Sequence, residues 1–301
     1  MSRVVRPGDS EWPRRLHELG PHAPPARLYA DGLPLPAVPA VAVVGTRRPT
    51  AAGLDAARAF ARSFAEAGLV VVSGFAVGID AAAHRAAIDA GGHTIAVLGC
   101  GLDVAYPRRN AALRRALLRS GTVVTEYPDG TPPLKHHFPL RNRVIAGLSL
   151  GVVVVEGALD SGALVTARLA LDANRSVYAL PGSVRNAMAE GPNDLVRRSE
   201  AQLVTRPEHV LQDLAPELVW RDRTAARRAA AALDATEAAV VALLDDVPVA
   251  ADRLERELDT TAGRLAVTLA RLEVRGLAAR RRGGYTITDA GARARGAAAQ
   301  R

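Results

Sequence analysis

Cysteine, lysine and aromatic residues are all scarce in this chain of 301 residues. The single cysteine, Cys100, excludes an internal disulfide, fits a reducing compartment, and is expected to be a small buried residue. Aromatic residues make up only 4%, so a core must be built mainly from Ala, Val and Leu. Lys135 is the only lysine, whereas arginine is abundant and the net charge is +8. That charge favours a polyanionic partner such as nucleic acid, although a GC-rich genome also produces arginine- and alanine-rich chains.

Several sequence signals are missing, and each absence narrows the function. The first residues contain no apolar signal-peptide core, and no uncharged apolar run approaches ~18 residues, which predicts a cytoplasmic protein without a membrane span. A phosphate-binding P-loop is excluded because the only lysine lies elsewhere. Gly99-Cys-Gly101 lacks the third glycine of the dinucleotide fingerprint, and no Gly-x-Ser-x-Gly elbow occurs. Residues with metal-ligating spacing are also missing, so we expect no metal, no cofactor and no catalytic set.

Short apolar runs alternate with helical patterns from residue 41 onward. The apolar runs lie at 41–45, 69–74, 94–99, 122–126, 151–156 and 176–180. The helical patterns lie at 50–67, 80–90, 109–119 and 162–174, with a short one ending near Leu148. Continuous apolar strands that alternate with helices predict a doubly wound α/β domain, with a parallel sheet covered on both faces, over residues 41–215.

The two ends of the chain differ from this pattern. Residues 1–40 are rich in proline and are expected to form an extended lead-in that is not part of the core. Residues 216–234 are predicted to be a linker, and residues 291–301 a disordered tail. Between them, residues 235–290 predict a small winged-helix-like domain of three helices and a hairpin, with Thr236 as the first helix cap. Leu265, Leu269 and Leu272 form the buried stripe of its third helix. Arg280, Arg281 and Arg282 are its best DNA-binding candidates, but a protein-contact or structural role is an equal alternative.

In a doubly wound sheet, ligands bind beyond the carboxyl ends of the strands. Glycine, serine and arginine follow several of the predicted strands, and helix starts rich in such residues bind anions well. The candidates there are Gly45, Thr46, Arg47, Arg48, Ser73, Gly74, Gly78, Asp80, His84, Ser161 and Gly162. Some of them have plainer interpretations. Gly45-Thr46-Arg47 fits an ordinary strand-to-helix turn, Asp80 a helix cap, His84 its structural partner and Ser161 an ordinary cap.

The stretch 133–143 concentrates one lysine, two histidines, one phenylalanine and two arginines in eleven positions. We predict a loop that grips phosphates and stacks on a base, and the alternative is a solvated basic loop before a helix. His136 and His137 are expected to point apart in an extended loop. Binding of single strands requires a basic groove and an aromatic platform, which Phe138 supplies beside Lys135 and Arg141. Without a catalytic set, this predicted edge favours a binding protein over an enzyme.

Motifs that run in order over residues 40–205 resemble the DNA-processing protein A (DprA/Smf) family. The matching segments are Val43–Arg47, Ser73–Asp80 with His84, Gly101–Pro107, Glu126–Pro128, Phe138–Ser149, Val154–Gly157, Ser161–Ala167 and Pro181-Gly182. The resemblance implies an extended Rossmann-like domain without enzymatic activity that binds single-stranded DNA and forms a homodimer. It also implies that this domain loads RecA recombinase onto DNA taken up in natural transformation. Some members carry a C-terminal winged helix.

The resemblance also implies roles for individual residues. Arg47 is similar to an arginine that contacts DNA phosphate, and Lys135 to the lysine before the Phe-Pro-x-Arg-Asn-Arg motif. Phe138 falls where a base-binding pocket is expected. The remaining implied residues are Arg141, Asn142 and Arg143 in the same crevice, and Ser161 and Gly162 in a phosphate-side turn. At Val77 the chain departs from the family, which often has arginine there, so one expected phosphate contact is missing.

Two other functions remain as alternatives. A nucleotide phosphoribohydrolase of the lysine-decarboxylase-like group would show Pro-Gly-Gly-x-Gly-Thr, but here Ser183-Val-Arg follows Pro181-Gly182. A winged-helix transcription regulator with an α/β ligand domain is the second alternative. Both are less favoured than the DNA-binding function.

Overall fold

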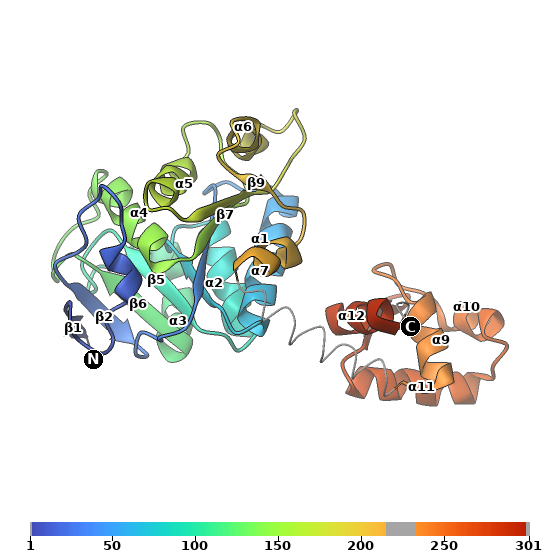
Figure 1. The fold of residues 1–301 in the computed structure, drawn as a ribbon. Coiled ribbons are helices and arrows are strands. Elements are labelled where there is room, and N and C mark those ends of the chain that lie inside the picture. The colour runs from blue at the N-terminus through green and yellow to red at the C-terminus, as the bar shows by residue number, and fades with distance from the viewer. Residues whose placement is uncertain (1, 215–232, 299–301) are drawn as a thin grey trace. The chain divides into compact units, whose positions relative to one another are not determined.

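The computed structural model describes residues 2–214 and 233–298, and the chain divides into two compact units, Met1–Pro216 and Glu217–Arg301 (Figure 1). Most of the predicted linker 216–234 lies outside the described residues. Within the described residues, no helix combines the length and the apolar composition needed to cross a bilayer.

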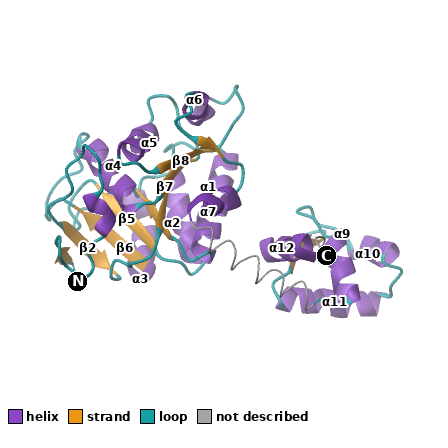
Figure 2. Ribbon diagram, viewed as in Figure 1, coloured by secondary structure: helices purple, strands orange, loops and turns teal. Residues whose placement is uncertain are grey.

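The first unit is built on a nine-stranded sheet in the order β1-β2-β6-β5-β4-β3-β7-β8-β9 (Figure 2). Its parallel part comprises β3 (Ala40–Val44), β4 (Val70–Ser73), β5 (Thr94–Leu98), β6 (Gly121–Thr125), β7 (Gly151–Val154), β8 (Ser176–Ala179) and β9 (Gln202–Leu203). The apolar runs of the sequence form these strands because a parallel sheet buries both faces of each strand. The predicted doubly wound α/β fold is confirmed.

Helices cover both faces of the sheet (Figure 1). One layer holds α1 (Ala51–Glu66), α2 (Ile79–Asp89), α3 (Ala111–Ser120) and α7 (Pro207–Leu214), and the other holds α4 (His137–Leu148) and α5 (Gly162–Asp172). The short helix α6 (Glu190–Arg197) follows β8. Because side chains alternate along a strand, Ile95 and Val97 join the cluster that contains α4, while Ala96 and Leu98 join the cluster that contains α3.

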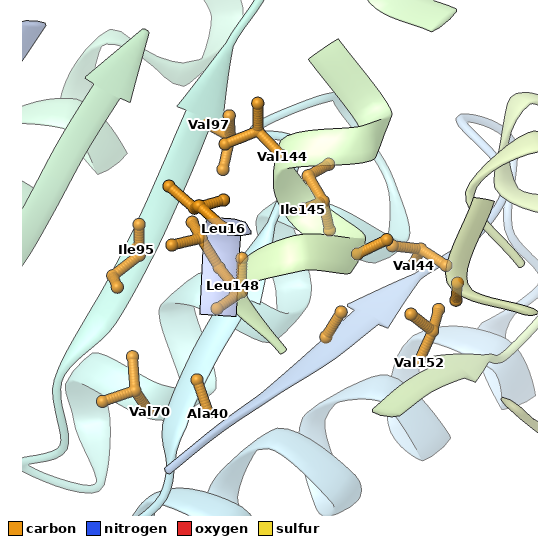
Figure 3. Close-up of a cluster of buried hydrophobic side chains, with 14 of the residues drawn as sticks. Leu16, Ala40, Val44, Val70, Ile95, Val97, Val144, Ile145, Leu148 and Val152 are labelled. Carbon is orange, nitrogen blue, oxygen red and sulfur yellow. The ribbon is translucent and has the colours of Figure 1, made fainter. Parts of the chain in front are cut away.

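The lead-in is part of the core, contrary to the prediction. Its β1 (Arg3–Val5) pairs with β2 (Leu28–Gly32), and β2 pairs antiparallel with β6, with Ala30 opposite Val124. Leu16, from the 3-10 helix η1 (Arg14–His17), is fully buried and lies beside Leu148 of α4 (Figure 3). The prolines at 21, 24 and 25 fall between η1 and β2, where they do not interrupt a hydrogen-bond ladder.

The second unit contains α9 (Ala235–Leu243), α10 (Ala251–Glu257), α11 (Ala262–Val274), β10 (Ala278–Arg281), β11 (Gly284–Ile287) and α12 (Asp289–Ala298). The predicted three helices, hairpin and leucine stripe of α11 are present, and Leu265, Leu269 and Leu272 are buried. The cap of α9 is Asp234 and not Thr236, because Asp234 and Glu237 form a reciprocal capping box. The predicted disordered tail is also corrected, since α12 forms there and buries Ala294.

Candidate nucleic-acid interface

A pocket opens at the carboxyl ends of β3, β4 and β5, and we call it the Phe138 pocket. Its cavity volume is about 40 Å³. Its lining comes from the turns after the three strands, from a loop that follows β5, and from α4: Arg47, Gly74, Phe75, Ala76, Val77, Leu98, Gly99, Cys100, Tyr106, Pro107, Phe138 and Arg141. The place of this pocket agrees with the rule that doubly wound sheets bind ligands beyond their carboxyl strand ends.

Phe138 lies in the first turn of α4 and is half-buried. Its ring lies close to the backbone of Gly99, since a Cβ built on Gly99 would be 3.1 Å from the ring. The Tyr106 ring packs beside it with centroids 5.6 Å apart, and the Arg47 guanidinium carbon lies 5.5 Å from its centroid. The pocket therefore offers an aromatic surface with a cation at its mouth, which is the combination that holds an unstacked base.

Arg47 lines the Phe138 pocket, and two further cations, Arg48 and Lys135, lie close in the sequence to its lining residues. Arg47 and Arg48 follow β3, and Lys135 lies three residues before Phe138; all three are exposed. Their side chains form no hydrogen bond or ion pair with any residue that the structure describes. Exposed, unpaired cations are available to bind phosphates. Thr46 helps to shape the turn after Gly45, because its hydroxyl accepts a hydrogen bond from the Arg48 N–H at 3.1 Å.

Arg141 lines the pocket as expected, but its side chain is engaged with the protein backbone. Its side chain is buried, and its guanidinium donates hydrogen bonds to the carbonyl of Gly74 at 2.8 Å and to the carbonyl of Val97. Burial lowers the pKa of Arg141 to about 10, so it stays charged at neutral pH. We expected this arginine to grip a DNA strand, but its donors hold the ends of β4 and β5 together under the pocket.

Asp80 and Gly74 complete the buried charge cluster. Asp80 lies in the first turn of α2, accepts a hydrogen bond from the Ala76 N–H at 3.2 Å, and has its pKa raised by burial. The cap residue of α2 is Gly78, so Asp80 is not the N-cap that the sequence suggested. A Cβ on Gly74 would lie 2.8 Å from both Arg141 Nη2 and Asp80 Oδ2. Glycine at position 74 therefore leaves the space that the Arg141 guanidinium and the Asp80 carboxylate occupy beside the backbone.

His84 and Ser73 are structural residues of the sheet region. His84 Nδ1 lies 2.7 Å from the hydroxyl of Thr94, which donates to the carbonyl of Val71, so His84 must donate from Nδ1. This corrects the expected pairing with Asp80, and full burial leaves His84 no contact with a ligand. Burial, with a smaller effect of nearby Arg141, lowers the pKa of His84 to about 3. Ser73 is also buried and donates to the carbonyl of Val43 at 2.7 Å.

The remaining predicted residues lie outside the pocket lining. Asn142 donates to the carbonyl of Gly162 at 3.2 Å and ties α4 to α5. Arg143 forms an ion pair with Glu126, which raises the pKa of Arg143. Ser161 caps α5 by accepting a hydrogen bond from the Ala163 N–H at 3.2 Å, as the plainer interpretation had it.

The prediction of an extended loop around His136 and His137 is wrong from residue 137 onward, where α4 begins. His137 is the first residue of α4, and its ring stacks on Tyr127 at a centroid distance of 4.1 Å. The ring of His136 contacts that of His137 edge-on at 4.5 Å, so the two do not point apart. Helix formation is possible here because proline at 139 falls within the first turn, where its missing N–H costs little.

Sequence reasoning missed three residues that shape the pocket. Phe75 and Tyr106 line it, and the buried Asn110 donates to the carbonyl of Phe75 at 2.8 Å and to that of Ala76 at 3.3 Å. Phe75 has φ of 60°, a left-handed backbone that an aromatic residue adopts at a cost. The two hydrogen bonds from Asn110 hold this conformation. The residue types around Phe75 gave no signal that predicts this left-handed conformation.

Fold and site together define an α/β protein of the Rossmann-like class, with a pocket lined by arginine and aromatic side chains at the carboxyl ends of its strands. Among the described residues there is no cluster of histidine, cysteine and carboxylate side chains that could hold a metal ion. The family model described as DNA recombination-mediator protein A matches residues 3–215, and the model of the DprA winged helix domain matches residues 224–284. The chain therefore belongs to the DNA recombination-mediator protein A (DprA/Smf) family, which confirms the resemblance of the motifs.

Two curated relatives show how far the similarity extends. The chain is 46% identical over 218 residues to Protein Smf of Escherichia coli K12, covering 71% of this chain and 57% of that protein. It is 44% identical over 205 residues to the DNA processing protein DprA of Streptococcus pneumoniae R6, covering 68% of this chain and 72% of that one. The chain thus spans little more than half of the length of the E. coli relative.

Two solved structures share the fold. The X-ray structure of DprA from S. pneumoniae matches with a TM-score of 0.66 and 40% identity, over 70% of this chain and 74% of that one. DprA from Helicobacter pylori, whose structure concerns a single-stranded DNA binding mode, matches with a TM-score of 0.64 and 29% identity, over 72% of this chain and 97% of that one.

Proposed function

We propose that this protein binds single-stranded DNA at the Phe138 pocket. One base lies against the ring of Phe138, and the phosphates beside it contact Arg47, Arg48 and Lys135. The observation that carries the proposal is the position of Phe138 in the lining of a pocket, with the exposed guanidinium of Arg47 5.5 Å from its ring centroid. The similarity to a relative with a described single-stranded DNA binding mode supports it.

The pocket favours a single strand over a duplex. A base can enter it only when it is unpaired and unstacked, which costs energy in a duplex and little in a single strand. Sequence preference should be weak, since every base has a π-face that can stack on Phe138.

The family membership extends the proposal to partners. We propose that the protein acts in the cytoplasm as a homodimer formed through its first unit, and loads RecA recombinase onto single strands taken up in natural transformation. It does so as a mediator and not as an enzyme. The polar groups below the pocket support that view, because Ser73, Asp80 and His84 are engaged with other groups of the protein and none is presented to a ligand as a nucleophile or base.

Fluorescence anisotropy tests the binding proposal. The wild type and Lys135→Ala are titrated with labelled single- and double-stranded oligonucleotides over a salt series. Arg62→Ala is the matched control, because Arg62 is an exposed cation of α1 that is not within three residues of any residue in the pocket lining. We expect tighter binding to single strands, and a salt slope reduced by about 0.7 in Lys135→Ala but not in Arg62→Ala. Equal affinity for both forms of DNA, or equal effects of both substitutions, would contradict the proposal.

RecA loading is tested separately. RecA filament assembly is measured on single strands that a single-strand binding protein already covers. The wild type should shorten the lag of assembly, and Lys135→Ala should not. If the wild type binds the strand but leaves the lag unchanged, the proposal of RecA loading is contradicted and the proposed DNA-binding site stands.

A further inference from the structure

A second hollow continues from the Phe138 pocket across the surface of the first unit, and we call it the Arg85 groove. It runs over the first turns of α1 and α2 to the start of α3. Arg47 and Val77 line both hollows, so the pocket and the groove meet at these two residues. A chain molecule that leaves the pocket past Val77 enters the groove directly.

The groove is strongly basic. Four arginines line it, Arg47, Arg58, Arg85 and Arg109, and no acidic residue is among its lining residues. Arg58 is paired with Asp55 at 2.7 Å, which offsets its charge. Arg85 and Arg109 are exposed and form no hydrogen bond or ion pair with any residue in the described part of the chain. Two free guanidinium groups therefore flank the groove beyond the pocket.

The floor of the groove indicates which part of a ligand lies there. It consists of small or aliphatic side chains such as Leu54, Ala81 and Leu113, and it contains no aromatic ring. A strand of nucleic acid is held either by bases stacked on aromatic rings or by phosphates on cations. This groove offers only the second kind of contact, so it suits a sugar-phosphate backbone.

The arginines are carried by a rigid support. Arg109 lies in the 3-10 helix η2 (Arg108–Asn110), and the next residue, Asn110, is tied to the carbonyls of Phe75 and Ala76. Arg85 lies within α2, whose cap Gly78 has φ of 89° and fits against the backbone of Thr46 and Arg47. The same two loops that shape the Phe138 pocket therefore fix the positions of the groove arginines.

We infer that the Arg85 groove holds the phosphates of nucleotides that flank the base in the Phe138 pocket, with Arg85 and Arg109 as the binding residues. The inference rests on the proposed function, because the strand must first occupy the pocket. It predicts that the contribution of the groove depends on strand length. A short strand fills the pocket alone, and a longer one also reaches both arginines.

The test compares two lengths of oligothymidylate, about 4 and about 16 nucleotides, which bracket the usual site sizes of single-strand binding domains. The variant is Arg85→Ala/Arg109→Ala, and the charge-matched control is Arg62→Ala/Arg119→Ala. Arg62 and Arg119 are also exposed, and neither lines a hollow described above. We expect the groove variant to bind the longer strand roughly tenfold more weakly, with a salt slope lower by about 1.4. Its affinity for the shorter strand should equal that of the control.

Several outcomes would overturn the inference. Equal losses in the groove variant and in the control would show that only net charge matters, and equal losses on both strand lengths would place the arginines at the pocket itself. A loss confined to duplex DNA would assign the groove to a different ligand. If Lys135→Ala weakens both lengths while the groove variant weakens neither, the groove inference fails and the proposed function stands. If the wild type binds neither length, both fail.

Discussion

Two arginines flank the ring of Phe138 at nearly equal distances, with guanidinium carbons 5.5 Å away for Arg47 and 5.9 Å away for Arg141. Arg47 is exposed and has no hydrogen-bonding partner among the described residues, whereas Arg141 is 5% exposed and donates to two strand-end carbonyls. Arginine thus occupies two different places in the pocket: Arg47 is an exposed cation at the rim, and Arg141 is a buried support of the floor. Burial and hydrogen bonding, and not charge, separate the two roles.

The largest expected effect comes from removing the floor arginine. Arg141→Met should lower the free energy of unfolding by about 3–5 kcal/mol, because Asp80 stays buried without its neighbouring cation and two carbonyls lose a donor. Urea unfolding followed by far-UV circular dichroism measures this change. Arg47→Ala, the rim counterpart, should keep the stability within about 0.5 kcal/mol and lower the affinity for single strands.

A second substitution sharpens the first. Asp80→Asn in the Arg141→Met background removes the buried carboxylate and should restore part of the lost stability. If Arg141→Met is as stable as Arg47→Ala, the distinction between a structural arginine in the floor and an exposed arginine at the rim is contradicted.

The next effect is a pH dependence of stability that comes from the buried His84. The pKa of His84 is about 3 in the folded protein and near 6.5 in an unfolded chain, so the unfolded state binds the proton first. The contribution of His84 to stability is therefore complete above about pH 6.5 and is lost as the pH falls toward 3. Asp80 acts in the opposite direction, because its raised pKa favours the folded state in acid and disfavours it as the pH rises.

Urea midpoints between about pH 4 and pH 7 test this dependence. His84→Gln should show a shallower decline than the wild type, and the exposed His17→Gln should keep the wild-type slope. A wild-type slope in His84→Gln would contradict the assignment.

The smallest expected effect concerns the rim at Val77, where the pocket meets the Arg85 groove. Val77→Arg adds a cation beside the strand and should raise the affinity for single strands roughly threefold to tenfold, with a salt slope steeper by about 0.7. Val184→Arg is the control, because Val184 is 91% exposed and lines neither hollow. Equal gains in the two variants, measured by anisotropy, would mean that net charge and not position sets the affinity.

The parallel sheet could be predicted because its strands are continuous valine-rich runs, buried on both faces. The antiparallel strand β2 could not be predicted as readily, because its apolar signal is only the alternation of Leu28 and Ala30 among prolines. The predicted loop over 133–143 overlaps the first half of α4, whose residue spacing carries a helical signal. Arg141, Ile145 and Leu148 share one helix face by spacing, and Figure 3 shows Ile145 and Leu148 among the core side chains. The left-handed backbone of Phe75 had no such signal, since it depends on hydrogen bonds from a residue 35 positions away.

The pairing of β2 with β6 has a consequence for biosynthesis. The chain emerges from the ribosome from its N-terminus, so Leu28–Gly32 is made on the order of 90 residues before its partner Gly121–Thr125. At usual rates of translation the first strands wait roughly 5 to 20 seconds with their apolar side chains uncovered. The prolines around them and their short length keep the waiting segment from pairing with other nascent chains. The strands β1 and β2 are thus synthesised before the parallel strands, but they can join the sheet only after β6 has been made.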